Sequence, residues 1–243
     1  MHARTLAVTA LFTAVVALAG CSSDNTLGLG TAGGGSSDSL NNARIRIANA
    51  TATSLDVASH GIVLAGNAGI GFGGSSNCTP TNALAPDLTV RPAGTLTVLP
   101  GLETSYQSGV SYTVIAYPDA VGTTLFATTA DTFTPVAGQS ALRVFNALLL
   151  GTSFDVYVTD PGEPLASAVP AFNSVAGASF TTFNNVTSGT LKQLRVTDAN
   201  SKTVLRDLGS TAFIAGQSVT LVIAPPLAST TTPRTFFVTG CNA

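Results

Sequence analysis

The chain has 243 residues and a formal net charge of −2, and only 9% of its residues are charged, against about 25% in an average globular protein. This composition excludes nucleic-acid binding as the main function, because such binding needs a basic stripe of lysine and arginine to replace counterions. Abundant threonine and valine with few charges instead suit the strands of an all-β protein outside the cytoplasm.

Residues 1–20 have the three parts of a secretion signal. A weakly basic start leads into residues 6–18, which form an apolar run without a charge. This run is too short to span a bilayer comfortably and is typical of a signal peptide. A Leu-Ala-Gly tripeptide then precedes Cys21, and this arrangement resembles the lipobox of bacterial lipoproteins. The alternative is an ordinary signal peptide followed by a chance cysteine.

The lipobox resemblance implies that the Cys21 thiol is lipidated, that the chain is cut before it, and that the new amino terminus is acylated. Each buried methylene contributes ~0.8 kcal/mol, so two or more acyl chains anchor a protein firmly. Ser22 follows instead of aspartate, which in a host with two membranes favours the outer one. Residues 21–42 are rich in Gly, Ser, Thr and Asn and predict a flexible tether that spans ~25 Å on average.

The rest of the chain contains an internal repeat. Residues 43–57 resemble residues 141–156, and the offset between matching residues grows slowly from 97 at Arg46/Arg143 to 107 at Gly109/Gly216. A period near one hundred residues is the size of a whole small domain. We therefore expect two domains, at residues 43–138 and 140–240.

Short strands with turns every 8–12 residues dominate both repeats and indicate β-sandwiches. At the start of repeat one, Ile45 and Ile47 alternate with Arg44 and Arg46. Alternation of this kind predicts a half-buried strand, with the isoleucines in the core and the arginines on the other face. The predicted fold class is all-β, with two tandem sandwich domains after a signal peptide and a flexible linker.

No catalytic or metal-binding constellation is recognisable in the sequence. His60 is the only histidine after the signal, and no G-x-S-x-G elbow accompanies it. A zinc site needs three or four His, Cys or acidic ligands, and these are too few and too scattered. Residues 69–74 match G-x-G-x-x-G but do not open a helix, as a dinucleotide loop must. We expect no enzyme activity, no metal and no cofactor.

Two aspartates and two cysteines have candidate structural roles. Asp56 and Asp155 occupy equivalent positions in the repeats, and each is expected to accept hydrogen bonds from a turn or to pair with Arg46 or Arg143. Cys78 and Cys241 remain once Cys21 is lipidated, and an even pair outside the cytoplasm predicts a disulfide. Free thiols, or pairing with another protein, are the alternatives.

The repeat motif itself resembles the bacterial family called domain of unknown function 4397. The matching residues in repeat two are Arg143, Asn146, Asp155, Val156 and Tyr157, and those in repeat one are Arg46, Asn49, Asp56 and Val57. The resemblance implies a secreted or lipid-anchored protein with tandem immunoglobulin-like sandwiches, and it implies no activity.

These observations together predict a lipid-anchored protein of the bacterial cell envelope, in contact with the membrane through Cys21. Its function would be structural or adhesive, with a protein or glycan of the envelope as its partner. The alternatives are an envelope hydrolase with an unrecognised acid-based site, and a passive surface spacer.

Overall fold

The computed structural model describes residues 42–134, 136–149, 151–226 and 230–241. The predicted signal peptide, Cys21 and nearly all of the predicted tether lie outside the described residues. The described residues form sixteen strands and no helix, and therefore hold no helix that is long and apolar enough to cross a membrane. The prediction of an all-β fold is confirmed.

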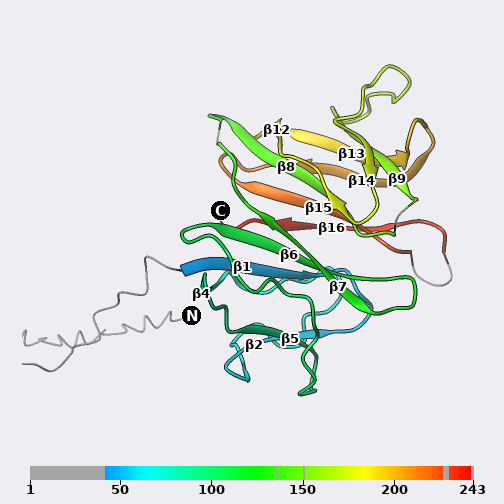
Figure 1. The fold of residues 1–243 in the computed structure, drawn as a ribbon. Helices are drawn as coiled ribbons and strands as arrows, with labels where there is room; N and C mark the ends of the chain where they lie inside the picture. The colour runs from blue at the N-terminus through cyan, green and yellow to red at the C-terminus, as the bar shows by residue number, and fades with distance from the viewer. Residues whose placement is uncertain (1–41, 135, 150, 227–229, 242–243) are drawn as a thin grey trace, which may run out of the picture. The chain divides into compact units, whose positions relative to one another are not determined.

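Repeat one forms two sheets (Figure 1). Its inner sheet has the strand order β4-β1-β6-β7 and its outer sheet the order β3-β2-β5. The strands are β1 (Asn42–Asn49), β2 (Leu55–Ser59), β3 (Ile62–Val63), β4 (Thr79–Asn82), β5 (Leu88–Pro92), β6 (Ser111–Pro118) and β7 (Thr124–Ala130).

Repeat two forms two sheets of its own. Its inner sheet has the order β11-β8-β15-β16, with β12 also paired to β8, and its outer sheet the order β10-β9-β13-β14. The strands are β8 (Gln139–Asn146), β9 (Ser153–Thr159), β10 (Phe172–Ala176), β11 (Ser179–Phe180), β12 (Asn184–Thr187), β13 (Leu191–Asp198), β14 (Val204–Ala212), β15 (Ser218–Ala224) and β16 (Arg234–Thr239).

Each repeat is a sandwich because its two sheets bury a common apolar core. In repeat one, Ile45 and Ile47 of the inner sheet pack in the same cluster as Leu55 and Val57 of the outer sheet. In repeat two, the core joins β8 and β15 to β9, β10 and β13. The inner sheets each contain one parallel pair, β1 with β6 and β8 with β15, beside antiparallel neighbours. The immunoglobulin-like character of these sandwiches stays a prediction.

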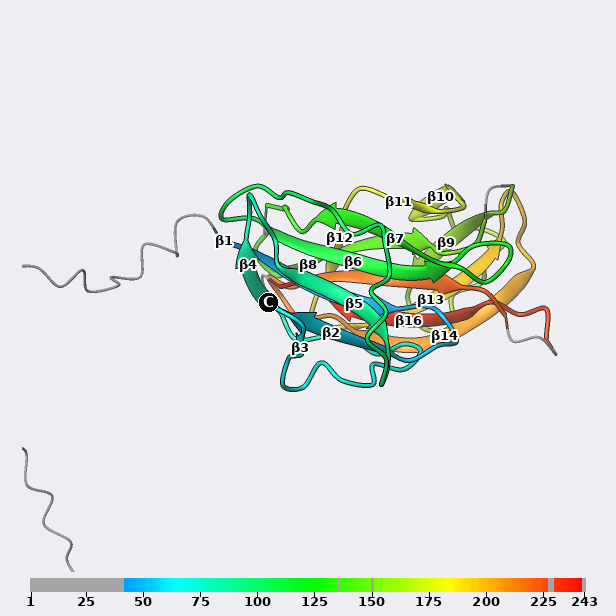
Figure 2. The ribbon, with the colours of Figure 1, turned by 60° about the horizontal axis from the view of Figure 1, so that its bottom comes forward.

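The two inner sheets also pack against each other, and we call this contact the seam. A third apolar cluster fills it, with Tyr117 and Phe145 in edge-to-face contact across it at a centroid distance of 5.4 Å. The buried members are Ala48, Ala50, Ile115 and Tyr117 from repeat one, and Phe145, Ala147, Val222, Ala224 and Val238 from repeat two. Figure 1 shows β15 and β16 of repeat two above β6 and β1 of repeat one, with β2 and β5 below these, and Figure 2 brings the outer sheet of repeat one forward.

The seam corrects the expected half-buried first strand. Ile45 and Ile47 do face the core of repeat one, but the opposite face of β1 is covered from Arg46 onward. Ala48 on that face is fully buried in the seam. Alternation identifies the two faces of a strand, but it does not indicate whether a second sheet covers the polar one.

Candidate functional site

Asn49 and its counterpart Asn146 organise the loop after the first strand of each repeat. Both are fully buried. The Asn49 amide donates to the carbonyls of Thr53 and Ile70, both at 2.8 Å, and its oxygen accepts from the Thr51 backbone at 2.8 Å. Asn146 repeats the pattern with Thr152, Val175 and Leu148. The shared asparagine therefore has a structural role in both repeats.

Asp56 and Asp155 also occupy equivalent positions, and each accepts two backbone hydrogen bonds. Asp56 accepts from Gly69 at 2.7 Å and from Gly94 at 2.9 Å, and these bonds hold the pKa of its carboxyl below the ordinary value. Asp155 accepts from the backbones of Ser174 and Asn200 at 2.7 and 2.9 Å. These are the turn hydrogen bonds expected from the sequence. In the part of the chain that the structure describes, neither aspartate forms an ion pair with Arg46 or Arg143.

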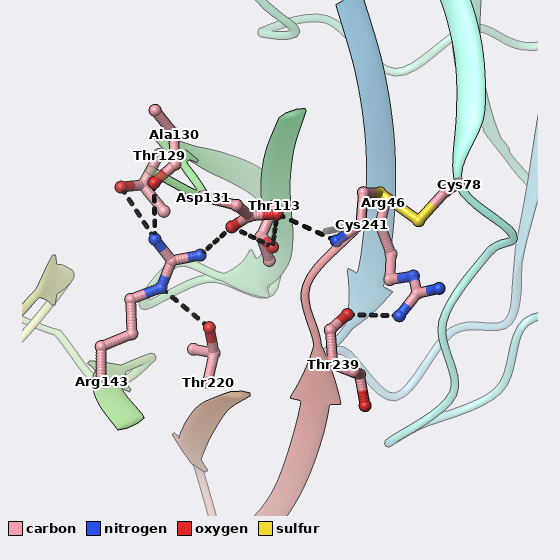
Figure 3. A network of polar contacts seen from close by, with 10 residues as sticks. All are labelled: Arg46, Cys78, Thr113, Thr129, Ala130, Asp131, Arg143, Thr220, Thr239 and Cys241. Atoms are coloured by element: carbon pink, nitrogen blue, oxygen red, sulfur yellow. Dashed lines mark hydrogen bonds and ion pairs between the residues drawn. A yellow bond between two sulfur atoms is a disulfide. The ribbon is translucent and has the colours of Figure 1, made fainter. Parts of the chain in front are cut away.

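Arg143 pairs instead with Asp131, a residue that the sequence did not single out (Figure 3). The two side chains are 2% and 0% exposed. The guanidinium also donates to the Thr220 hydroxyl and to the Ala130 carbonyl, both at 2.8 Å. The Thr113 hydroxyl contacts both Asp131 oxygens, at 2.8 and 3.0 Å. Burial lowers the pKa of Arg143 while Asp131 opposes this shift, and an arginine stays charged at neutral pH.

Arg143 therefore links the two repeats, because Asp131 and Thr113 belong to repeat one and Thr220 to repeat two. The only sequence signal for Asp131 is a single acid in the connector between the last strand of repeat one and the first strand of repeat two. Nothing in the linear pattern pairs it with Arg143.

The carboxyl end of the chain joins the same network. Arg46 donates to the carbonyl of Thr239, and the Cys241 backbone donates to Asp131 at 3.3 Å. Cys241 forms a disulfide with Cys78, across 163 residues and with the Cα atoms 5.6 Å apart. The predicted bridge is thus present, and it ties repeat one to the end of repeat two beside the buried ion pair (Figure 3).

A groove of about 480 Å³ opens next to Arg143. Its lining combines the aromatic rings of Phe133 and Phe183, whose centroids are 5.6 Å apart, with threonine hydroxyls and the Asn185 amide. Phe183 also stacks on the Arg143 guanidinium at 4.5 Å. Because Asp131 neutralises Arg143, the groove offers hydrogen bonds and apolar contact without a free charge. This chemistry suits binding of a neutral polar group.

His60 lies away from the seam, in a Ser-His-Asp cluster that does not have triad geometry. Its Nδ1 contacts Asp87 at 2.7 Å and also lies 3.1 Å from the Ser59 hydroxyl, which itself donates to Asp87. A triad needs one imidazole nitrogen for the acid and the other for the nucleophile. Here one nitrogen faces both, and the imidazole is 82% exposed. Within the described ranges, no group of three or more His, Cys, Asp or Glu could hold a metal ion.

The comparisons with known proteins add no relative, since no protein-family profile and no curated protein matches the chain.

Proposed function

We propose that this chain is a non-catalytic, lipid-anchored protein of the bacterial cell envelope, and a member of the family called domain of unknown function 4397. Cys21 anchors it to the outer membrane, and residues 21–42 tether two immunoglobulin-like sandwiches that act as one rigid module. The module binds an envelope protein or glycan.

The observation that carries this proposal is the Cys78–Cys241 bridge at the seam. Disulfides persist in oxidising compartments such as the periplasm and the cell surface, and the signal-like amino terminus points to the same places. The bridge, the buried Arg143–Asp131 pair and the apolar seam all hold one repeat against the other. A passive spacer has no need of such a seam, whereas a binding surface shared by two domains does.

The hydrolase alternative is less well supported. Its best candidate is the cluster of Ser59, His60 and Asp87, in which the serine proton already goes to the carboxylate. The groove beside Arg143 contains no paired base and nucleophile among its lining residues. A binding role therefore agrees better with the chemistry of both places.

The test is the intact mass of the full chain expressed in a bacterial host with two membranes, alongside the Cys21→Ser variant. We expect the wild-type protein in the outer-membrane fraction, with the mass of the chain from Cys21 plus acyl chains. The C21S variant should carry no acyl mass, and a Cys78→Ser/Cys241→Ser control should keep its anchor. A wild-type mass without acyl chains would refute the proposal that Cys21 carries a lipid anchor.

A further inference from the structure

A second hollow, of about 320 Å³, forms where the two repeats meet around β14 and β16. Phe72 comes from repeat one, Arg206 from β14 in the outer sheet of repeat two, and Arg234 and Thr235 from β16 in its inner sheet. The hollow therefore exists only when the seam is closed. Its volume lies at the lower end of the range typical of small-molecule sites.

Arg234 is a partly buried cation without an acidic partner. Its guanidinium carbon lies 3.5 Å from the centroid of the Phe72 ring, and its Nε donates to the Pro225 carbonyl at 2.8 Å. Among the described residues, no carboxylate is within ion-pair distance of it. Burial lowers the pKa of Arg234, and no acid opposes that shift. Arg143 differs in this respect, because Asp131 compensates its charge.

Arg206 brings a second guanidinium to the same hollow. Its side chain is exposed and makes no hydrogen bond or ion pair with the part of the chain that the structure describes. No aspartate or glutamate is among the lining residues. Two of the ten Lys and Arg residues of a net-negative chain thus line one hollow without a counter-charge. The two guanidinium groups therefore present positive charge without an acidic partner to the hollow, which favours an anion as its occupant.

We propose that this hollow binds a carboxylate-bearing carbohydrate, with the sugar carboxylate between Arg206 and Arg234. Guanidinium groups bind carboxylates through paired, charge-assisted hydrogen bonds. The hydroxyls of Thr232 and Thr235 can exchange hydrogen bonds with sugar hydroxyls, and Pro233 adds an apolar contact surface. This inference deepens the binding role of the proposed function and rests on it for the source of the ligand, an acidic glycan of the envelope.

The experiment uses the full chain, expressed with its own leader and purified from whichever cell fraction holds it. Isothermal titration calorimetry at low salt compares tetragalacturonate, its methyl ester and inorganic phosphate. We expect the acid tetrasaccharide to bind and the neutral ester not to bind. Affinity should fall steeply between 50 and 200 mM salt, as roughly expected when exposed charges are screened.

Arg206→Glu is the decisive variant because the exposed Arg206 side chain makes no described hydrogen bond or ion pair, so its replacement should leave the fold intact. It should weaken binding of tetragalacturonate by about 10-fold or more, the effect of about 1.4 kcal/mol. Arg234→Lys keeps the charge but loses the planar group, and should weaken binding less. Arg44→Ala is the matched control, since Arg44 is also an exposed arginine on a strand without a described side-chain partner.

Equal binding of the acid and its methyl ester, or full affinity in R206E, would overturn the site. In a third outcome, phosphate binds in a manner that depends on Arg206 while tetragalacturonate does not bind. That result would refute the carbohydrate as the ligand and would identify the hollow as a site for a small free anion. None of these results depends on acylation of Cys21. The anchor and the site can therefore fail separately.

Discussion

The buried ion pair at the seam makes a sharp prediction about stability. Replacing Asp131 with asparagine keeps the shape of the side chain but removes its charge, so Arg143 becomes an uncompensated buried cation. The two side chains are 0% and 2% exposed, which leaves little solvent to screen that charge. Breaking a buried pair in this way lowers the free energy of unfolding by about 3–5 kcal/mol. For a chain of this size, the melting temperature should fall by roughly 10 °C.

The control is an exposed pair in the same protein. Lys192 and Asp160 lie 2.6 Å apart, and the Asp160 side chain is 72% exposed. Asp160→Asn should therefore change the free energy of unfolding by no more than about 1 kcal/mol. Both variants are measured by urea denaturation with the disulfide intact, followed by circular dichroism.

A double variant separates loss of the pair from loss of shape. In Arg143→Met combined with Asp131→Asn, no charge of the pair stays buried, so the double variant should be more stable than D131N alone. A D131N variant within about 1 kcal/mol of the wild type would refute the reasoning, because the seam would then tolerate an unpaired arginine.

Two further predictions concern the disulfide and the repeated aspartate. Replacing Cys78 and Cys241 with serine should lower the free energy of unfolding by about 5 kcal/mol in the chain-entropy model, because the bridge spans 163 residues. The urea midpoint measures this, and an unchanged midpoint would contradict it. The pKa of Asp56 is lowered in the folded state by the backbone hydrogen bonds of Gly69 and Gly94. Its ionised form therefore contributes stability above about pH 4 that is lost as the pH falls through the folded value. Asp56→Asn should be less stable at pH 7 and should lose less on acidification to pH 3, whereas parallel losses in both proteins would argue against the role of Asp56.

The seam shows that the two repeats are packed together and are not independent domains. Two copies of one sandwich could be independent modules on a string, but here both copies contribute a face to the same apolar cluster. The seam covers β1 from Arg46 onward and buries Arg143 of β8, so these two arginines of the shared motif both serve the contact between the repeats. Their partners differ, since Arg46 donates to the Thr239 carbonyl whereas Arg143 pairs with Asp131.

The sequence by itself was enough to predict the repeat and the all-β class, and it favoured the pairing of the two cysteines that the structure contains. These properties can be read from the order of residues along the chain. Strands are predicted from alternating polar and apolar residues, because a strand has two faces, and the disulfide is predicted from the even number of cysteines that remain after Cys21. The sequence also predicted that Asp56 and Asp155 accept hydrogen bonds from turns, since the two aspartates occupy matching positions in the two repeats. The described geometry agrees with it.

Only the tertiary structure decided which surfaces face each other. The partner of Arg143, the covered face of β1, and the hollow between Arg206 and Arg234 all depend on how one sheet packs on another. Such contacts join segments that are distant along the chain, and no periodic pattern within a strand records them. The physical reason is that a strand's sequence specifies how polar each face is, while packing between sheets determines what that face meets.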